Sequence, residues 1–375
     1  MSSSAGGGAR DLALRITRPP VREMKAATPP SDDSGADAST ERVARLDSNE
    51  NRFGASAKAL EAATRSLSSA NEYPDPHARA LREAIARMTD ASPDEVVCAS
   101  GSDGVTQLIT RAFFSEGDEL LTVSATFVGP LKAARLAGLH VRKVPLSEGY
   151  EYDLARVGEA VTDRTRVIYL ANPNNPTGTY FTDDAFRALM ERVPAEVLVV
   201  VDEAYAEFAA SLAPGYREVF SHRYPNVIVL RTFSKAYGLA GLRVGYALGP
   251  RELIEPMATA KLKFDPSGPA QAAALAALED DEFVQEAVRR TARGRERMYR
   301  IFESYGLEHV PSWTNFVLVP FNREEEAVHC TDELARRGVR VRRLPMFGLP
   351  SCVRITVGSD PELEQLDRSL SEIYS

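Results

Sequence analysis

Lys235 stands in surroundings that a solvated surface lysine does not need. It follows an apolar run and lies within "RTFSKAYGLAGLRVG" (231–245), among hydroxyl, small and glycine residues. Burial in such a cradle lowers the pKa of an amine, and an uncharged lysine can attack a carbonyl carbon. Arg243 follows eight residues later, and the glycines let the backbone approach a phosphate closely. Taken alone, Lys235 is also consistent with an ordinary solvated lysine.

Polar residues follow several other apolar runs in the same way. Ser102 and Asp103 lie in "GSDG", between a predicted strand and a predicted helix, where free backbone N–H groups can bind an anion. Asn175 lies in "NPNNPTG", which predicts a turn. Asp202 and Tyr205 follow "VLVVV", and a carboxylate at the end of a buried strand needs a partner. Singly, each is also consistent with a turn, a helix cap or a structural ion pair.

The elements that would position these residues alternate regularly up to about residue 266. Short apolar runs such as "ELLTV", "RVIYLA" and "NVIVL" are separated by segments with helical pattern. This alternation predicts an α/β fold with a mainly parallel sheet covered by helices on both faces. Ligands bind beyond the carboxyl ends of such strands, so we expect the polar residues to converge there. After residue 266 the order of helices and strands changes, which predicts a second, smaller α+β unit.

Composition excludes several classes of protein. The chain of 375 residues has a formal net charge of -8, which disfavours a nucleic-acid or anionic-membrane surface. Its three cysteines and five histidines are scattered, so neither a disulfide framework nor a metal site is expected. The N-terminus lacks the pattern of a targeting signal, and no run of about 20 apolar residues could span a membrane. We therefore expect a cytoplasmic protein whose residues 1–45 form a flexible arm.

Together the converging residues describe a site for a phosphorylated cofactor with a cationic aromatic ring, bound covalently to a lysine. Pyridoxal 5'-phosphate needs an amine, an acid opposite its pyridine nitrogen, donors to its ring hydroxyl, an aromatic face and a phosphate cup. Phe127, in "SATFVGP" after another predicted strand, supplies the aromatic face. Alone, Phe127 is equally consistent with packing in the core.

The chain resembles the fold type I pyridoxal-phosphate enzymes, in particular the class I/II aminotransferases and, within these, the histidinol-phosphate aminotransferase family. The resemblance covers most of the chain from residue 45 onward and rests on an ordered set of motifs: "DSNENRFG", "YPDP", "GSDG", "NPNNPTG", "VDEAY", "RTFSKAYGLAGLRVGY" and "VRITVG". It implies a seven-stranded, mainly parallel sheet sandwiched by helices. The implied domains are the arm 1–45, a large cofactor-binding domain 67–266, and a small domain 46–66 plus 267–375.

The resemblance also implies a role for each matching residue. Lys235 resembles the lysine that binds the cofactor and moves the proton, and Asp202 the acid that keeps the ring nitrogen protonated. Tyr205 and Asn175 would bind the ring hydroxyl, and Phe127 would stack on the ring. The residues that would hold the phosphate are Ser102, Asp103, Thr232, Ser234, Arg243 and, from a neighbouring subunit, Tyr73. The residues that would bind the substrate are Arg354, Arg342 and Asn51.

These roles imply a homodimer with shared active sites. The enzyme would move an amino group from a small donor to a 2-oxo acid, which is expected to be 2-oxoglutarate. Three features depart from the family: Arg52 replaces the usual proline of "NENPFG", Gly104 replaces an acid, and no tyrosine precedes Tyr73. The donor is therefore left open between histidinol phosphate and an aromatic or other specialised amino acid, and Arg52 is expected to influence the choice. A decarboxylase of the threonine-phosphate type, on the same fold, is the alternative.

Overall fold

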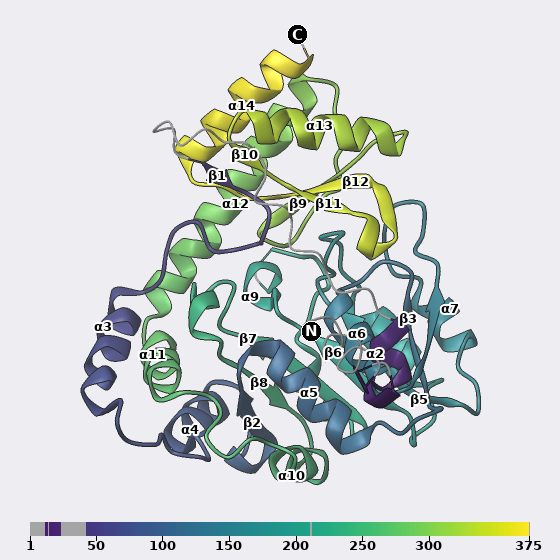
Figure 1. Ribbon diagram of the computed structural model, residues 1–375, viewed down its shortest axis with the longest axis vertical. Coiled ribbons are helices and arrows are strands. Elements are labelled where there is room, and N and C mark those ends of the chain that lie inside the picture. Colours follow the sequence, from purple (N-terminus) through teal and green to yellow (C-terminus); the bar gives the residue numbers. More distant parts are fainter. Residues whose placement is uncertain (1–11, 14, 24–42, 211, 375) are drawn as a thin grey trace, which may run out of the picture.

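A computed structural model describes residues 12, 13, 15–23, 43–210 and 212–374 (Figure 1). The predicted flexible arm falls largely outside the described residues. Within it, the structure describes a short helix, α2 (Pro19–Glu23), which contacts α6 (Val128–Leu136).

A seven-stranded sheet forms the centre of the larger part of the molecule, and it confirms the predicted α/β fold. Its strand order is β2-β8-β7-β6-β5-β3-β4, and only β8 runs antiparallel to its neighbours. The strands are β2 (Val96–Ala99), β3 (Glu119–Val123), β4 (His140–Val144), β5 (Thr165–Ala171), β6 (Leu198–Asp202), β7 (Val227–Thr232) and β8 (Gly245–Leu248). The sequence did not predict β8, which is short and lies at the end of a glycine-rich motif.

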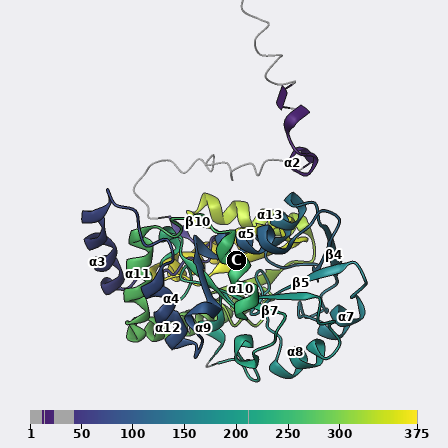
Figure 2. The same cartoon turned by 90° about the horizontal axis from the view of Figure 1, so that it is seen from below.

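Both faces of this sheet are buried, because successive residues of a strand point to opposite sides. In β6, Val199 and Val201 pack into one core while Val200 packs into the other. In Figure 2, α5 lies above the sheet and α8 below it. The first core is covered by α4 (Arg79–Met88), α7 (Leu154–Glu159), α8 (Asp183–Met190) and α11 (Gly268–Leu278), and the second by α5 (Gly101–Phe113), α6 and α10 (Arg251–Thr259).

A second, antiparallel sheet of three strands lies above the first (Figure 1). Its strands are, in order, β11 (Arg342–Leu344), β12 (Leu349–Thr356) and β9 (Phe316–Pro320). Three helices pack their apolar side chains against it: α12 (Asp281–Ser304), α13 (Glu324–Arg336) and α14 (Asp360–Tyr374). Figure 1 shows the long α12 rising from beside the large sheet to the small one.

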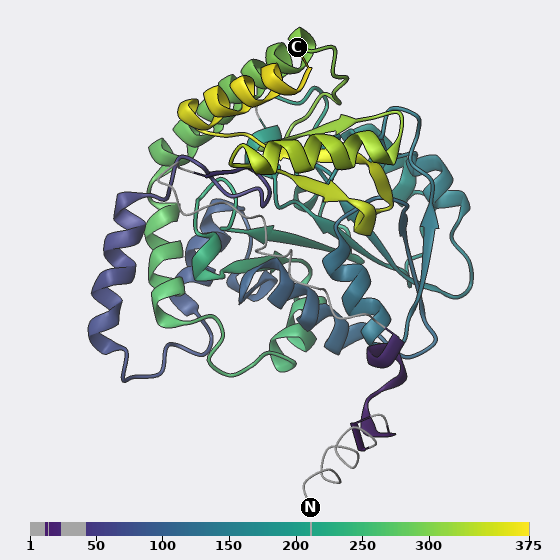
Figure 3. The ribbon, with the colours of Figure 1, turned by 45° about the horizontal axis from the view of Figure 1, so that its top comes forward.

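The run "VRVRRL" (339–344) is divided between two strands in the structure. Val339 and Arg340 form β10, which pairs in parallel with β1 (Ala44–Arg45), whereas β11 begins at Arg342. The chain after β1 therefore enters the molecule between the two sheets. It then leads into α3 (Ala57–Ser66), which packs against α11 beside the large sheet (Figures 1 and 3). The predicted domain boundaries stay a prediction.

Candidate active site

The polar residues predicted at the strand ends converge on one cavity of about 140 Å³ beyond the carboxyl ends of β5, β6 and β7. Ten of the eleven residues predicted to bind the cofactor line it. These are Ser102, Asp103, Phe127, Asn175, Asp202, Tyr205, Thr232, Ser234, Lys235 and Arg243.

Lys235 lies half-buried in the wall of this cavity, in the turn that follows β7. Its Nζ donates a hydrogen bond of 3.2 Å to the backbone oxygen of Asn49. Burial and the positive charges of Arg354 and Arg243 lower the pKa of Lys235 to about 8, while Asp202 and Glu50 act in the opposite direction. The amine is therefore easier to deprotonate than an ordinary lysine, as nucleophilic attack requires.

Asp202 ends β6 and is only 5% exposed. Its Oδ2 accepts a hydrogen bond of 2.8 Å from Tyr169 Oη, and its Oδ1 accepts one of 3.1 Å from the Ala204 N–H. Burial raises the pKa of Asp202 to about 6, although both hydrogen bonds oppose that rise. Among the described residues no cation lies within ion-pair distance of this carboxylate, so a cationic ring nitrogen in the cavity would supply the missing partner.

Arg243 and the first turn of α5 form one end of the cavity. The sequence placed "GSDG" before the predicted helix, but α5 begins at Gly101. Ser102 and Asp103 therefore lie in its first turn, where backbone N–H groups have no helical acceptor. Arg243 Nη2 donates to Asp103 Oδ2 at 3.2 Å. Gly245 permits this close packing, since a Cβ there would lie 2.8 Å from the carbonyl carbon of Gly101.

Tyr205, Asn175 and Phe127 are three further members of the cavity. Tyr205 is buried, and its Oη accepts a hydrogen bond of 2.9 Å from Asn49 Nδ2. Asn175 Oδ1 accepts one of 2.6 Å from Arg354 Nη1. Phe127 immediately precedes α6 and lines the cavity with its ring.

A larger cavity of about 790 Å³ adjoins the first and shares Phe127, Asn175, Tyr205 and Lys235 with it. Arg342 and Arg354 both line it, and they are direct partners in the register of β11 with β12. Apolar side chains complete its wall, among them those of Val341, Pro345, Met346 and Phe347.

Arg354 is 5% exposed, and two of its nitrogens are satisfied by Asn175 and by the backbone oxygen of Asp47. Its Nε has no hydrogen-bond partner. Within the described part of the chain no carboxylate pairs with it, and burial together with the nearby Arg342 lowers its pKa to about 10. A buried guanidinium without a carboxylate is costly, so Arg354 is well suited to bind an anion that enters the cavity.

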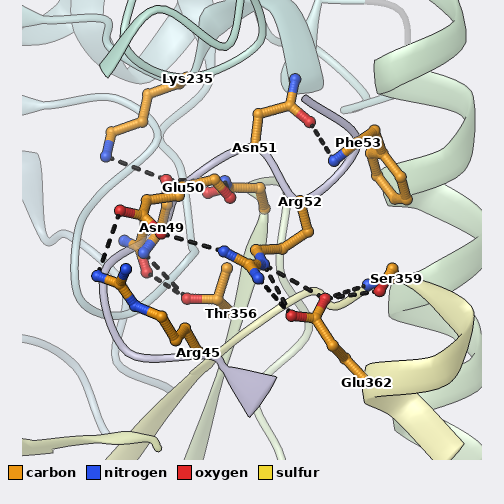
Figure 4. A network of polar contacts seen from close by, with 11 residues as sticks. Arg45, Asn49, Glu50, Asn51, Arg52, Phe53, Lys235, Thr356, Ser359 and Glu362 are labelled. Carbon is orange, nitrogen blue, oxygen red and sulfur yellow. Dashed lines mark hydrogen bonds and ion pairs between the residues drawn. The ribbon is translucent and has the colours of Figure 1, made fainter. Parts of the chain in front are cut away.

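Two predicted site residues lie apart from both cavities. Tyr73 is 80% exposed and stacks on Phe264, with ring centroids 4.1 Å apart. Asn51 lines neither cavity; its Nδ2 donates to the backbone oxygen of Ala236. Asn49, which sequence reasoning did not single out, accepts the hydrogen bond from Lys235 instead (Figure 4). Its side chain also donates to Tyr205.

Arg52 also points away from the larger cavity. Its guanidinium donates to the carboxylates of Glu362 on α14 and Glu50 (Figure 4). The expectation that Arg52 would influence the donor by standing beside it has no direct contact to support it. Tyr169 is a second residue that the sequence did not reveal, because a tyrosine inside the apolar run "TRVIYLA" looks like core.

The donor set fits pyridoxal phosphate in chemical type. Hydroxyls, helix N–H groups and an arginine lie at one end of the cavity. A buried carboxylate that has no cationic partner among the described residues also lines it, as does an amine of lowered pKa. The family model described as "Aminotransferase class I and II" matches residues 41–372.

The chain belongs to the class I and II aminotransferases.

Within this family, the chain is similar to histidinol-phosphate aminotransferases. The chain is 40% identical over 331 residues to a histidinol-phosphate aminotransferase of Geobacillus sp. (strain WCH70), covering 88% of this chain and 90% of that protein. It is 38% identical over 357 residues to the enzyme of the same name from Bacillus velezensis, covering 94% and 98%.

Solved structures of aminotransferases also resemble this chain in fold. The crystal structure of histidinol-phosphate aminotransferase from Sinorhizobium meliloti in complex with pyridoxal 5'-phosphate matches with a TM-score of 0.87 and 30% identity, over 96% of this chain and 97% of that one. A single mutant of aspartate aminotransferase from Thermus thermophilus matches with a TM-score of 0.84 and 26% identity, over 96% and 98%. The protein is thus a pyridoxal-phosphate-dependent aminotransferase of fold type I.

Three further features of the described residues concern membrane spans, metal sites and cysteines. None of their helices is both long and apolar enough to cross a membrane. No group of three or more histidine, cysteine or acidic side chains among them could hold a metal ion. Cys98, Cys330 and Cys352 are buried and free.

Proposed function

We propose that the protein transfers an amino group from histidinol phosphate, or from an amino donor that likewise joins a ring to an anionic group, to 2-oxoglutarate. The observation that carries this proposal is the pair Arg354 and Arg342, which are register partners in the wall of a cavity that also contains Lys235. Arginine binds carboxylate and phosphate bidentately, so the pair can receive the anionic end of the donor and of the acceptor in turn.

The rest of the larger cavity supports a donor with a ring. Met346 and Phe347 line it on the side of β11, next to the two arginines. An apolar and aromatic wall beside a cationic one suits a substrate that carries a planar ring and an anionic group. The names of the similar proteins from Geobacillus and Bacillus velezensis make histidinol phosphate the first donor to test.

The residues around the smaller cavity would hold the cofactor. Ser102, Thr232, Ser234 and Arg243 would bind its phosphate, and Asp103 would keep Arg243 in place. Phe127 would cover one face of the ring, while Asn175 and Tyr205 would bind the ring hydroxyl.

Bound pyridoxal phosphate supplies a protonated ring that accepts electrons when a Cα–H bond of the amino donor breaks. Asp202 would hold the proton on the ring nitrogen, because its carboxylate has no other cation among the described residues. Lys235 Nζ would take the proton from the donor's Cα, and the lowered pKa of Lys235 suits it to act as a base near neutral pH. Arg354 and Arg342 would fix the anionic end, so that the Cα–H bond is held toward Lys235.

Two finer points belong to the same proposal. The active unit would be a homodimer with shared sites, because Tyr73 has no role in the cavities of its own chain and is exposed. The protein would act in the cytoplasm, where its three buried cysteines would stay reduced.

A panel of donors with 2-oxoglutarate tests the proposal. Histidinol phosphate, phenylalanine, tyrosine and aspartate are supplied separately, and glutamate formation and carbon dioxide release are both measured. We expect glutamate to form at the highest kcat/KM with histidinol phosphate, without carbon dioxide. Higher kcat/KM with another donor would overturn the substrate, and release of carbon dioxide without glutamate would show a decarboxylase instead.

A further inference from the structure

Arg52 forms the centre of a charged network beside the candidate site (Figure 4). Its Nε donates to both carboxylate oxygens of Glu362, at 3.0 and 3.3 Å, and its Nη2 also contacts that carboxylate. Its Nη1 donates to Glu50 Oε2 at 3.2 Å. One guanidinium is thus shared between an acid on α14 and an acid of its own segment.

The Glu362 side of this network is firmly held. Glu362 is 8% exposed, and its Oε2 accepts hydrogen bonds from both the backbone N–H and the hydroxyl of Ser359. Burial opposes its ionisation, but the hydrogen bonds from Arg52 and Ser359 outweigh burial and lower the pKa of Glu362. Arg52 therefore has a charged and well-oriented partner, as a strong bidentate pair requires.

The Glu50 side of the network is held less firmly and lies next to the segment that contacts Lys235. The other cation near Glu50 is Arg45, at 3.8 Å, and its side chain is 56% exposed. The residue before Glu50 is Asn49, whose backbone oxygen accepts from Lys235 Nζ and whose Nδ2 donates to Tyr205 Oη. Without Arg52, the carboxylate of Glu50 would be free to turn toward the Lys235 amine.

Asn49 itself depends on how this segment is held. Its φ of 54° is in the left-handed region, which asparagine tolerates better than most residues. Thr356 and Asn315 hold it from the small-sheet side, and Asn51 ties the segment to the backbone of Ala236, next to Lys235. Arg52 adds a link from the same segment to α14.

We propose that Arg52 is a positioning residue for the amino-transfer reaction: it engages Glu50 and Glu362 together, which keeps the Glu50 carboxylate from pairing with Lys235 and holds Asn49 against Lys235 and Tyr205. This inference rests on the proposed role of Lys235. It replaces the expectation that Arg52 selects the donor by contact.

The charged groups that act on Lys235 define the direction of the effect. Arg354 and Arg243 lower the pKa of Lys235, and Asp202 and Glu50 raise it. Removing Arg52 takes a positive charge from the neighbourhood and leaves Glu50 with Arg45 alone. Both changes favour the protonated amine, so the reactive, neutral form of Lys235 becomes scarcer.

Acylation of the apoprotein tests this without the cofactor. Apoprotein is treated with acetic anhydride over a range of pH, and the acylation of Lys235 is followed by peptide mass spectrometry. In Arg52→Gln we expect the fraction of reactive Lys235 at a fixed pH near 8 to fall about tenfold, the effect of an opposite charge that moves into pairing distance. The double variant Glu50→Gln with Arg52→Gln should restore the wild-type profile.

Two further variants separate positioning from stability. Glu362→Gln removes a negative charge and leaves Arg52 paired with Glu50, so it should not reproduce the shift expected of Arg52→Gln. Arg297→Gln breaks an ion pair with the exposed Asp360 at the start of the same helix and should leave the profile unchanged. If all variants change only the melting temperature, or if adding Glu50→Gln to Arg52→Gln does not restore the profile, the inference is wrong.

The loaded enzyme supplies an independent readout. Arg52→Gln should lower kcat/KM by the same factor for every donor, since Arg52 touches none of them, and the visible band of the bound cofactor should titrate at a higher pH. A changed ranking of donors would overturn the inference in favour of a contact with substrate. If wild-type protein shows no such band, the proposed function fails, whereas the acylation profiles still decide the role of Arg52.

Discussion

Tyr169 Oη lies 2.8 Å from Asp202 Oδ2 and donates a hydrogen bond to it from the neighbouring strand. Tyr169 is fully buried, and burial together with the charge of Asp202 raises its pKa well above the usual value. The tyrosine therefore stays protonated and remains a donor. Asp202 is thus held from behind by β5 while its carboxylate faces the cavity.

Replacing Tyr169 by phenylalanine should move the pH dependence of the enzyme. The hydrogen bond from Tyr169 lowers the pKa of Asp202, so its loss raises that pKa further above the ordinary value. The carboxylate is then protonated over a wider range, and the acidic limb of kcat/KM shifts to higher pH. At pH 6 we expect a loss of about tenfold, as one pKa unit implies.

The pH profile of Tyr169→Phe beside that of the wild type checks this. Tyr224→Phe is the matched control, because Tyr224 is remote from both cavities and packs on Phe186. An acidic limb in the same place for Tyr169→Phe would show that the hydrogen bond does not tune Asp202.

The order of most elements and the convergence of the predicted residues on the smaller cavity could both be predicted from the sequence. Apolar runs that end in Asp202, Thr232 or "NPNNPTG" locate the strands, and parallel strands bring their carboxyl ends to one edge. Because the carboxyl ends of parallel strands must meet at one edge of the sheet, ten side chains from separate motifs could be assigned to one cavity. The strand β8 was missed since four residues after a glycine-rich loop give no periodic signal.

Contacts that depend on tertiary packing could not be predicted. Asn51 and Asn49 belong to the same short motif, and only the path of the chain between the two sheets decides that Asn49 reaches Tyr205. Arg52 likewise finds Glu362, more than 300 residues away in the sequence. Such partners leave no local pattern because they are fixed by how α14 packs on the small sheet.

Lys235→Met should make the apoprotein more stable at neutral pH. The pKa of Lys235 is lowered to about 8 from an ordinary value near 10.5, so its folded-state charge is unfavourable below pH 8. That cost is present in full below the folded-state pKa, shrinks as the pH rises toward 10.5, and vanishes above it. The shift of about 2.5 pKa units corresponds to about 3.5 kcal/mol at most, at about 1.4 kcal/mol per unit.

Urea unfolding of both apoproteins at pH 7 and pH 10.5 measures this difference. Lys235→Met should have the larger free energy of unfolding at pH 7, and the gap should narrow at pH 10.5. The exposed Lys132 on α6 provides the control, and Lys132→Met should show no such pH-dependent gap. A variant less stable than wild type at pH 7 would contradict the lowered pKa of Lys235.

Tyr73 is expected to complete the site of a neighbouring subunit, and hybrid dimers test this directly. Lys235→Ala and Tyr73→Ala chains are co-expressed with different tags, and the mixed dimer is purified. If Tyr73 acts across the interface, one of its two sites contains both a native Lys235 and a native Tyr73. We expect that site to bind the cofactor with wild-type affinity, more tightly than the Tyr73→Ala homodimer.

If Tyr73 acts only within its own chain, the mixed dimer will bind the cofactor no better than Tyr73→Ala. Analytical ultracentrifugation supplies the complementary measurement. A wild-type protein that is fully active as a monomer would remove the basis of the shared-site proposal.

Arg354→Ala should weaken binding of acidic substrates without harming the fold. Arg354 is buried, its Nε has no partner, and no carboxylate among the described residues pairs with it. We expect KM for every acidic donor and for 2-oxoglutarate to rise by about tenfold to a few hundredfold, as loss of a charge-assisted hydrogen bond of roughly 1.5–3 kcal/mol implies. Arg342→Ala should act in the same direction but less, because Arg342 is more exposed and retains water as a partner.

The melting temperature separates substrate binding from a structural role for Arg354. If Arg354 served to neutralise a buried acid, its removal would leave that acid unpaired and lower the melting temperature while KM changed little. Because it carries an unpaired buried charge instead, Arg354→Ala should melt at the wild-type temperature or above it. Arg323→Ala, which removes an exposed ion pair with Glu326, controls for the loss of a positive charge and should change neither quantity. Steady-state kinetics and a thermal melt of the three variants therefore distinguish an anion-binding arginine from a structural one.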